Sequence, residues 1–162
     1  MKTDARPRTA AKGTFTPVYA PRRILVPVDF SPLSDEAVDR AAELALHSSG
    51  EILLIHVVEP MIYPIDPLVV PAPMEDANLQ MLQGSKRRLS EVRERIASRG
   101  VKCEAATVVG KPYHQIVETA RKKKADLIVL PTHGHTGLKH IYLGSTAEKV
   151  VRHAPCSVLV VR

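Results

Sequence analysis

Five short apolar runs, each separated from the next by a segment with helical spacing, constrain the fold of this chain more than any other feature. Short apolar runs bounded by turn residues are typical of strands buried on both faces, and their alternation with helices favours a parallel sheet. We therefore predict an α/β fold, a three-layer open sandwich around a five-stranded, mostly parallel sheet. The predicted strands are Arg23–Asp29, Glu51–Val58, Val101–Val109, Asp126–Leu130 and Ser157–Val161.

Capping residues place the helices between these strands. Ser31 is a suitable N-cap and Pro32 fits the first position of a helix that we expect to end at Gly50. A long helix is predicted over Met74–Arg99, after an irregular loop over Met61–Pro73 that carries four prolines. Two more helices are predicted, one with the apolar face Tyr113, Ile116, Val117 and Ala120, and one that begins at Gly144, Ser145 and Thr146.

Most of the net charge lies at the start of the chain. The formal net charge is +6, and six basic residues and one acidic residue in positions 1–23 supply +5 of it. We predict a flexible basic arm over residues 1–21 and one folded domain over residues 22–162. Because the domain is close to neutral, its charge argues against nucleic acid as the main partner.

The sequence contains no segment typical of membrane or secreted proteins. No apolar run approaches the ~20 residues that span a bilayer, and the basic arm lacks the continuous apolar stretch of a secretory signal. Cys103 and Cys156 each lie in an apolar segment, which favours two buried, reduced thiols. We therefore expect a cytoplasmic protein that makes no membrane contact.

The segment from Pro131 to Val151, PTHGHTGLKHIYLGSTAEKVV, concentrates glycines, histidines and hydroxyl residues. His133 and His135 have a spacing that can hold zinc, but further ligands must converge, and the loop contains no cysteine or carboxylate. We therefore predict no metal site there. The alternatives are a phosphate-binding loop and a plain glycine-containing turn in which Ser145 caps the following helix.

The phosphate hypothesis depends on the start of the last helix, at Gly144. The first amides of a helix have no intrahelical partner and attract anions, and glycine lets the backbone approach a phosphate closely. In open parallel sheets, ligands bind at the carboxyl ends of the strands where the strand order reverses. Asp29 and this loop each follow a strand directly, so we expect them to face one crevice if those two strands are neighbours where the order reverses.

Four motifs in order resemble the universal stress protein family: ILVPVDFSPLSDEAV, LLIHVVE, ADLIVLPTHGHTG and LGSTAEKVVRHAPCSVLVV. The likeness covers nearly everything from Arg22 to Arg162. It implies a Rossmann-like sheet with strand order 3-2-1-4-5 and a homodimer formed through the last strand.

The ATP-binding branch of that family carries G-x-x-G, nine residues and then G-[ST]. Gly134, Gly144 and Ser145 match this pattern, whereas Pro131 replaces the first glycine. By resemblance, Asp29 would meet the adenine side of ATP bound with Mg²⁺, and Val57 would offer main-chain groups to the base. The phosphates would be held by Gly134, Gly144, Ser145 and Thr146. The full set of implied ligand-binding residues is Pro27, Asp29, Val57, Leu130, Pro131, Thr132, Gly134, Gly144, Ser145 and Thr146.

The sequence shows no spacing typical of a nucleophile, base and orienting residue. We therefore expect no catalytic residues and at most slow ATP hydrolysis, in a nucleotide-responsive stress-response protein. The alternative is a module of the same fold that does not bind ATP and acts through protein partners. Pro131 and the proline-rich loop motivate that alternative.

Overall fold

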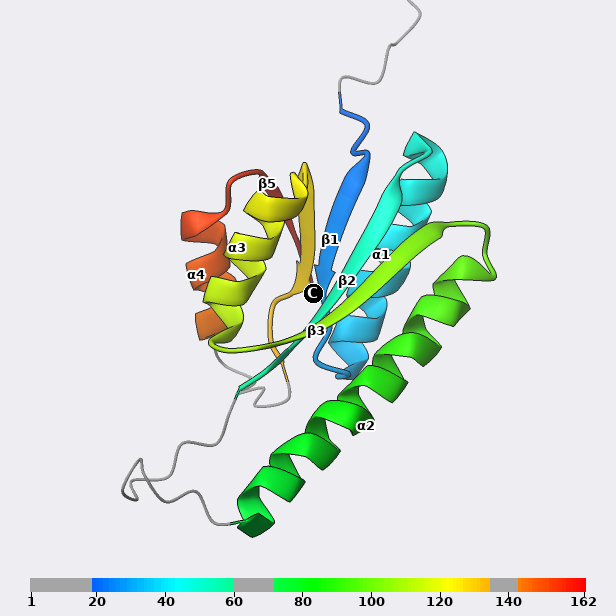
Figure 1. Ribbon diagram of the computed structural model, residues 1–162. Coiled ribbons are helices and arrows are strands. Elements are labelled where there is room, and N and C mark those ends of the chain that lie inside the picture. The colour runs from blue at the N-terminus through cyan, green and yellow to red at the C-terminus, as the bar shows by residue number, and fades with distance from the viewer. Residues whose placement is uncertain (1–18, 60–71, 135–142) are drawn as a thin grey trace, which may run out of the picture.

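The computed structural model describes residues 19–59, 72–134 and 143–162, which form one five-stranded sheet with helices on both faces (Figure 1). All strand pairs are parallel, and the order is β3-β2-β1-β4-β5, as the resemblance implied. The strands are β1 (Arg23–Pro27), β2 (Glu51–Val58), β3 (Lys102–Val109), β4 (Leu127–Pro131) and β5 (Ser157–Val161). The helices are α1 (Pro32–Ser48), α2 (Ala72–Ala97), α3 (Pro112–Lys123) and α4 (Ser145–His153).

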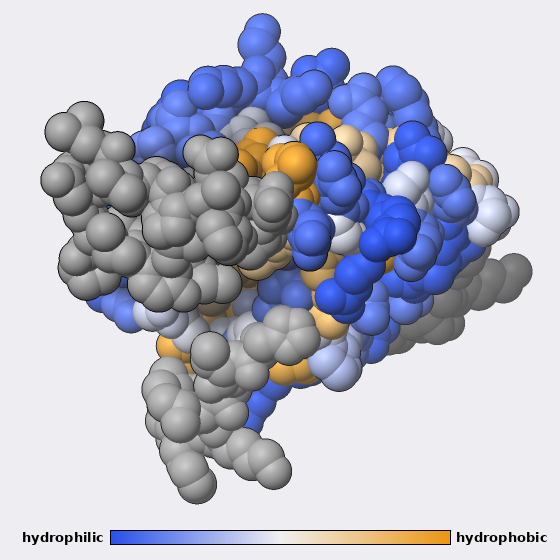
Figure 2. Space-filling view, turned by 60° about the horizontal axis from the view of Figure 1, so that its bottom comes forward, coloured by the Kyte–Doolittle hydropathy of each residue, from blue (hydrophilic) through white to orange (hydrophobic). Residues whose placement is uncertain are grey.

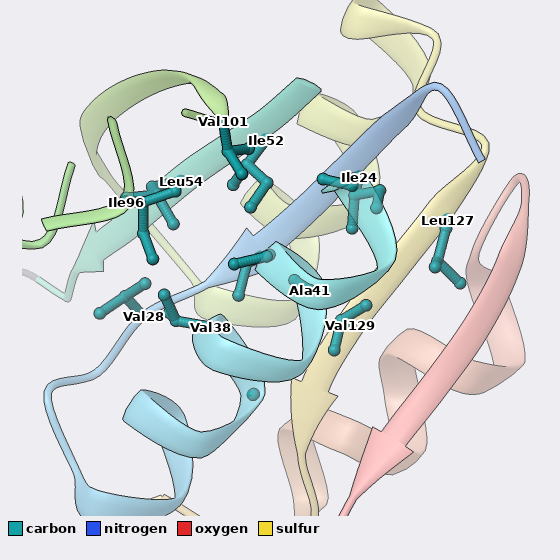
Figure 3. Packing of buried hydrophobic residues seen from close by; sticks show 14 of the residues in the cluster. Ile24, Val28, Val38, Ala41, Ile52, Leu54, Ile96, Val101, Leu127 and Val129 are labelled. Carbon is teal, nitrogen blue, oxygen red and sulfur yellow. The ribbon is translucent and has the colours of Figure 1, made fainter. Parts of the chain in front are cut away.

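Two apolar cores lie on opposite faces of the sheet, because successive side chains along a strand alternate in direction. Ile24 and Val26 of β1 point into the core under α1 and α2, part of which is drawn in Figure 3. Leu25, between them, points into the core under α3 and α4. All three side chains are fully buried, so β1 is the centre of the molecule and its carboxyl end is fixed by packing on both sides.

The predicted boundaries of the elements are close to those observed. β2 and β5 have the predicted bounds, β1 ends at Pro27 rather than at Asp29, and β4 is displaced by one residue. Helix α2 begins at Ala72 and ends at Ala97, so the last two residues of the predicted loop belong to the helix. The rest of that loop, residues 61–71, lies outside the described residues, as do residues 1–18 of the predicted arm.

The end of α1 corrects one prediction about glycine. Ser49, not Gly50, adopts the left-handed conformation that ends the helix, with φ of 52°. A Cβ on Gly50 would lie 2.6 Å from the Pro21 carbonyl oxygen. Glycine is therefore required at position 50 because the chain leading into β1 passes close to it, and not because of its own backbone angles.

The two cysteines differ from the prediction of buried thiols. Both are free and only partly buried, and they lie on opposite faces of the sheet, so they cannot form a disulfide within one domain. Burial raises the pKa of Cys103 to about 11 and also raises the pKa of Cys156. No helix in the described part of the chain is long and apolar enough to cross a bilayer.

Candidate functional site

A cavity of about 270 Å³ opens at the carboxyl ends of β1 and β4, which are neighbours in the sheet. Figure 2 looks toward this end of the molecule, where apolar surface is exposed among hydrophilic residues. The structure brings every residue of the predicted site to the wall of this cavity. They are Pro27, Asp29, Val57, Leu130, Pro131, Thr132, Gly134, Gly144, Ser145 and Thr146.

Asp29 is held in place by the turn that leads from β1 into α1. Its Oδ1 atom accepts hydrogen bonds from the Ser31 backbone N–H at 3.0 Å and from the Ser31 hydroxyl at 2.6 Å. Its own backbone N–H donates to the hydroxyl of Ser34 at 3.2 Å. The Ser31 hydroxyl oxygen also accepts from the Ser34 N–H and so caps α1, as the sequence predicted. One carboxylate oxygen is therefore fixed, and the orientation of the other follows from it.

The second carboxylate oxygen, Oδ2, lies against Gly134 in the loop after β4. A Cβ added at position 134 would overlap this oxygen. The loop that follows β1 and the loop that follows β4 therefore meet at Asp29 and Gly134, as the crevice hypothesis required. A side chain at position 134 would have to displace the Asp29 carboxylate, so glycine lets the two loops approach this closely.

Gly144 has a role that the sequence did not reveal. It is the N-cap of α4 with ordinary extended angles, and its N–H donates to the Thr132 carbonyl oxygen at 2.8 Å. A Cβ at this position would lie 3.0 Å from that same oxygen. Glycine here lets the start of α4 pack against the end of β4, so a larger residue would disturb the wall of the cavity as well as any ligand in it.

The start of α4 offers backbone donors to the cavity. The bond from the Glu148 N–H to the Gly144 carbonyl oxygen, 2.9 Å long, is the first bond of the helical pattern, and no side chain among the described residues caps this end. The amides of Ser145, Thr146 and Ala147 precede that bond, and such amides carry the positive end of the helix dipole. Because the N-cap is Gly144, the alternative that Ser145 caps the helix is wrong.

The rest of the lining is apolar and comes partly from α3. Pro112 and Ile116 of this helix complete a surface formed by strand-end residues such as Pro27, Val57 and Leu130. Three further lining residues were not predicted, Val28, Ile55 and Ala147, and His133, which was considered as a metal ligand, also lies in the lining. The α3 residues could not be found from sequence, because their apolar spacing indicates only a buried helix face and not what that face borders.

The described lining carries little formal charge. Asp29 is its one carboxylate, and no lysine or arginine belongs to the described residues around the cavity. The imidazole of His133 lies beside Thr132, with Nδ1 3.1 Å from the threonine hydroxyl oxygen. His135, Gly137 and His140 lie outside the described residues, and within the described ones no three potential metal ligands of the His, Cys, Asp and Glu types converge.

Comparison with known proteins decides the family. The model of the universal stress protein family matches residues 21–162. The chain belongs to the universal stress protein family. A universal stress protein of Methanocaldococcus jannaschii, MJ0531, is 38% identical over 141 residues, which cover 87% of this chain and 82% of the relative.

Solved universal stress proteins have the same fold. UspA of Lactobacillus plantarum superposes with a TM-score of 0.79 at 28% identity, over 87% of this chain and 97% of that one. A universal stress protein solved in complex with cAMP superposes with a TM-score of 0.65 at 28% identity, over 89% of this chain and 98% of that one. At least one protein of this fold and family therefore binds an adenine nucleotide.

Pro131 lines the cavity without disturbing the sheet of this universal stress protein. It is the last residue of β4 and pairs in register with Val161. The next donor, the Thr132 N–H, still bonds to the Val161 carbonyl oxygen at 2.8 Å. Proline lacks an N–H, so Pro131 itself donates no backbone hydrogen bond, while the pairing of β4 with β5 is intact.

Proposed function

We propose that this universal stress protein binds an adenine nucleotide, ATP with Mg²⁺, in the cavity at the carboxyl ends of β1 and β4, and acts as a nucleotide-responsive stress-response protein. The observation that carries the proposal is the composition of one cavity. Its lining combines apolar side chains, a carboxylate held by hydrogen bonds and the start of a helix. The cAMP complex of a related protein supports adenine as the base.

Each part of the lining suits one part of the nucleotide. The apolar surface that includes Val57 and Leu130 suits the flat base, whose polar edge would meet main-chain groups at Val57. Asp29 would accept hydrogen bonds from the adenosine side of the ligand. The amides that open α4 and the hydroxyls of Ser145 and Thr146 would bind the phosphates.

The charge of the lining explains why a divalent cation belongs to the proposal. A triphosphate brings several negative charges to a wall whose one described carboxylate is Asp29 and which has no described lysine or arginine. Magnesium bound by the phosphate oxygens neutralises part of that charge. Because the described lining also lacks an arginine positioned for phosphoryl transfer, we expect at most slow hydrolysis.

Calorimetric titration with ATP and Mg²⁺ tests the proposal. We expect saturable binding with one site per chain, and absence of binding at millimolar ATP would reject it. The variant Asp29→Ala should weaken ATP more than free triphosphate, whereas equal weakening would remove Asp29 from the adenosine side. Adenine nucleotide released on denaturing the purified protein would argue against the alternative, a module that acts through protein partners without ATP.

We also propose that the protein forms a homodimer through β5 and functions in the cytoplasm with protein partners. β5 is an edge strand, and Leu159 on it and Val151 on the adjacent α4 are exposed apolar residues. An exposed apolar edge is a template for pairing with a second chain. Sedimentation should give a dimer for the wild type and a monomer for Leu159→Lys, and an unchanged mass for the variant would place the interface elsewhere.

A further inference from the structure

The residue after Asp29 has a backbone conformation that is costly for its type. Phe30 has φ of 65°, in the left-handed region that bulky residues rarely adopt. The turn places consecutive side chains on different sides of the sheet. Asp29 lines the cavity, whereas Phe30 packs against the core under α1 and α2. Such strain persists only where surrounding contacts maintain it.

Two side chains from other elements contact the ring of Phe30. The His56 ring lies with its centroid 4.5 Å from that of Phe30, and the Arg88 guanidinium carbon lies 4.1 Å from the Phe30 centroid. Nδ1 of His56 is 2.7 Å from the Val28 carbonyl oxygen, so this imidazole is itself fixed to the end of β1. The contacts with the ring are of the aromatic and cation–π types, and both stabilise the ring in its position.

The hydrogen bonds of Asp29 depend on the same turn. Ser31, which donates twice to Oδ1, follows Phe30 directly. If φ of Phe30 relaxed to a negative value, the direction of the chain after it would change, and the N–H and hydroxyl of Ser31 would move away from the carboxylate. The left-handed conformation of Phe30 is therefore a condition for the orientation of Asp29 toward Gly134.

We infer that Phe30, held by His56 and by Arg88 of α2, is a positioning residue that sets the orientation of the Asp29 carboxylate for the ligand. The identity of the ligand in this inference rests on the proposed function, whereas the geometry of the turn does not depend on it. It makes Arg88, a residue outside the described lining of the cavity, a determinant of affinity for the adenosine part of the nucleotide. The phosphate-binding end at α4 is independent of it.

The experiment compares Phe30→Leu and Arg88→Met with the control Arg87→Met, which removes the neighbouring exposed guanidinium of α2. Each variant is titrated by calorimetry with three ligands: ATP with Mg²⁺, adenosine, and inorganic triphosphate. ATP and adenosine should bind about tenfold more weakly to Phe30→Leu and about threefold more weakly to Arg88→Met. Triphosphate binding should stay within twofold, and the control should match the wild type. In an Asp29→Ala background, Phe30→Leu should have no further effect.

A second measurement does not depend on any ligand. Hydrogen exchange of the Ser31 amide, which donates to Asp29 in the wild type, should be about tenfold faster in Phe30→Leu and unchanged in the control. The inference would be overturned if Phe30→Leu weakened ATP binding equally with and without Asp29. Unchanged exchange of the Ser31 amide in both Phe30→Leu and Arg88→Met would also overturn it. If the wild type binds no nucleotide, the proposed function fails, and the exchange measurement still decides the role of Phe30.

Discussion

Replacing Gly134 by alanine tests the contact that joins the two loops of the site. The new methyl group would overlap Oδ2 of Asp29. The carboxylate cannot simply rotate away, because its other oxygen accepts from Ser31 at 2.6 and 3.0 Å. Either those hydrogen bonds break or the loop after β4 moves away from the cavity wall.

The expected size of the effect follows from these bonds. Each hydrogen bond to a charged group contributes about 1.5–3 kcal/mol, and a displaced Asp29 loses a bond of this kind to the ligand. ATP affinity should therefore fall about 10- to 150-fold. Strain from the added methyl group should lower the free energy of unfolding by about 1–2 kcal/mol, or about 2–8 °C in the melting temperature.

The assay is calorimetry with ATP and Mg²⁺, together with thermal unfolding of the free protein. Gly84→Ala is a matched control, because a Cβ at this position in α2 meets no atom within 4 Å. Alanine is favoured over glycine inside a helix by about 1 kcal/mol, so this control should bind ATP normally and melt slightly higher.

A double variant identifies the cause of the loss. In an Asp29→Ala background the carboxylate that the new methyl group would overlap is gone, so Gly134→Ala should weaken binding little further. Wild-type affinity and melting temperature in Gly134→Ala would show that Asp29 and Gly134 do not make this contact. A loss that is equally large in both backgrounds would show that Gly134 acts through its own contacts and not through Asp29.

Three further predictions concern other parts of the molecule. Gly144→Ala places a Cβ 3.0 Å from the Thr132 carbonyl oxygen, so it should cost about 1–2 kcal/mol in unfolding free energy, measured with urea, and weaken ATP binding as well. Cys103, with its pKa raised to about 11 by burial, should react with iodoacetamide at pH 8 about 100-fold more slowly than an ordinary thiol, and a rate near that of free cysteine would contradict this. The hydrogen bond from Lys102 holds the pKa of Glu51 below its ordinary value. This pair should therefore stabilise the fold near neutral pH and lose that effect as the pH falls through the lowered pKa. The urea midpoint of Lys102→Met should fall less on acidification than that of the wild type.

The sequence specified the elements well because the apolar runs are long enough to be unambiguous. Glu51–Val58 and Ser157–Val161 are bounded by charged or turn residues and have the predicted bounds. The carboxyl ends of parallel strands meet at one edge of the sheet, so the opposition of Asp29 and the loop after β4 could be predicted only on the condition that β1 and β4 are neighbours. The strand order, by contrast, came from the family resemblance and not from residue spacing.

What could not be predicted depends on contacts between distant segments. Gly50 looks like a helix terminator in sequence, yet the nearby Pro21 carbonyl explains it and Ser49 ends the helix. Nothing in the sequence places Arg88 at the ring of Phe30, because the register of α2 against the sheet is fixed only by tertiary packing.

A crystal structure of the protein grown with ATP and Mg²⁺ would locate the nucleotide and not only detect its binding. We predict that the base lies against the apolar strand ends and α3, that Asp29 forms a hydrogen bond with the adenosine part, and that phosphate oxygens lie at the amides of Ser145 and Thr146. A nucleotide bound on another surface, or phosphates that lie away from the start of α4, would contradict this prediction.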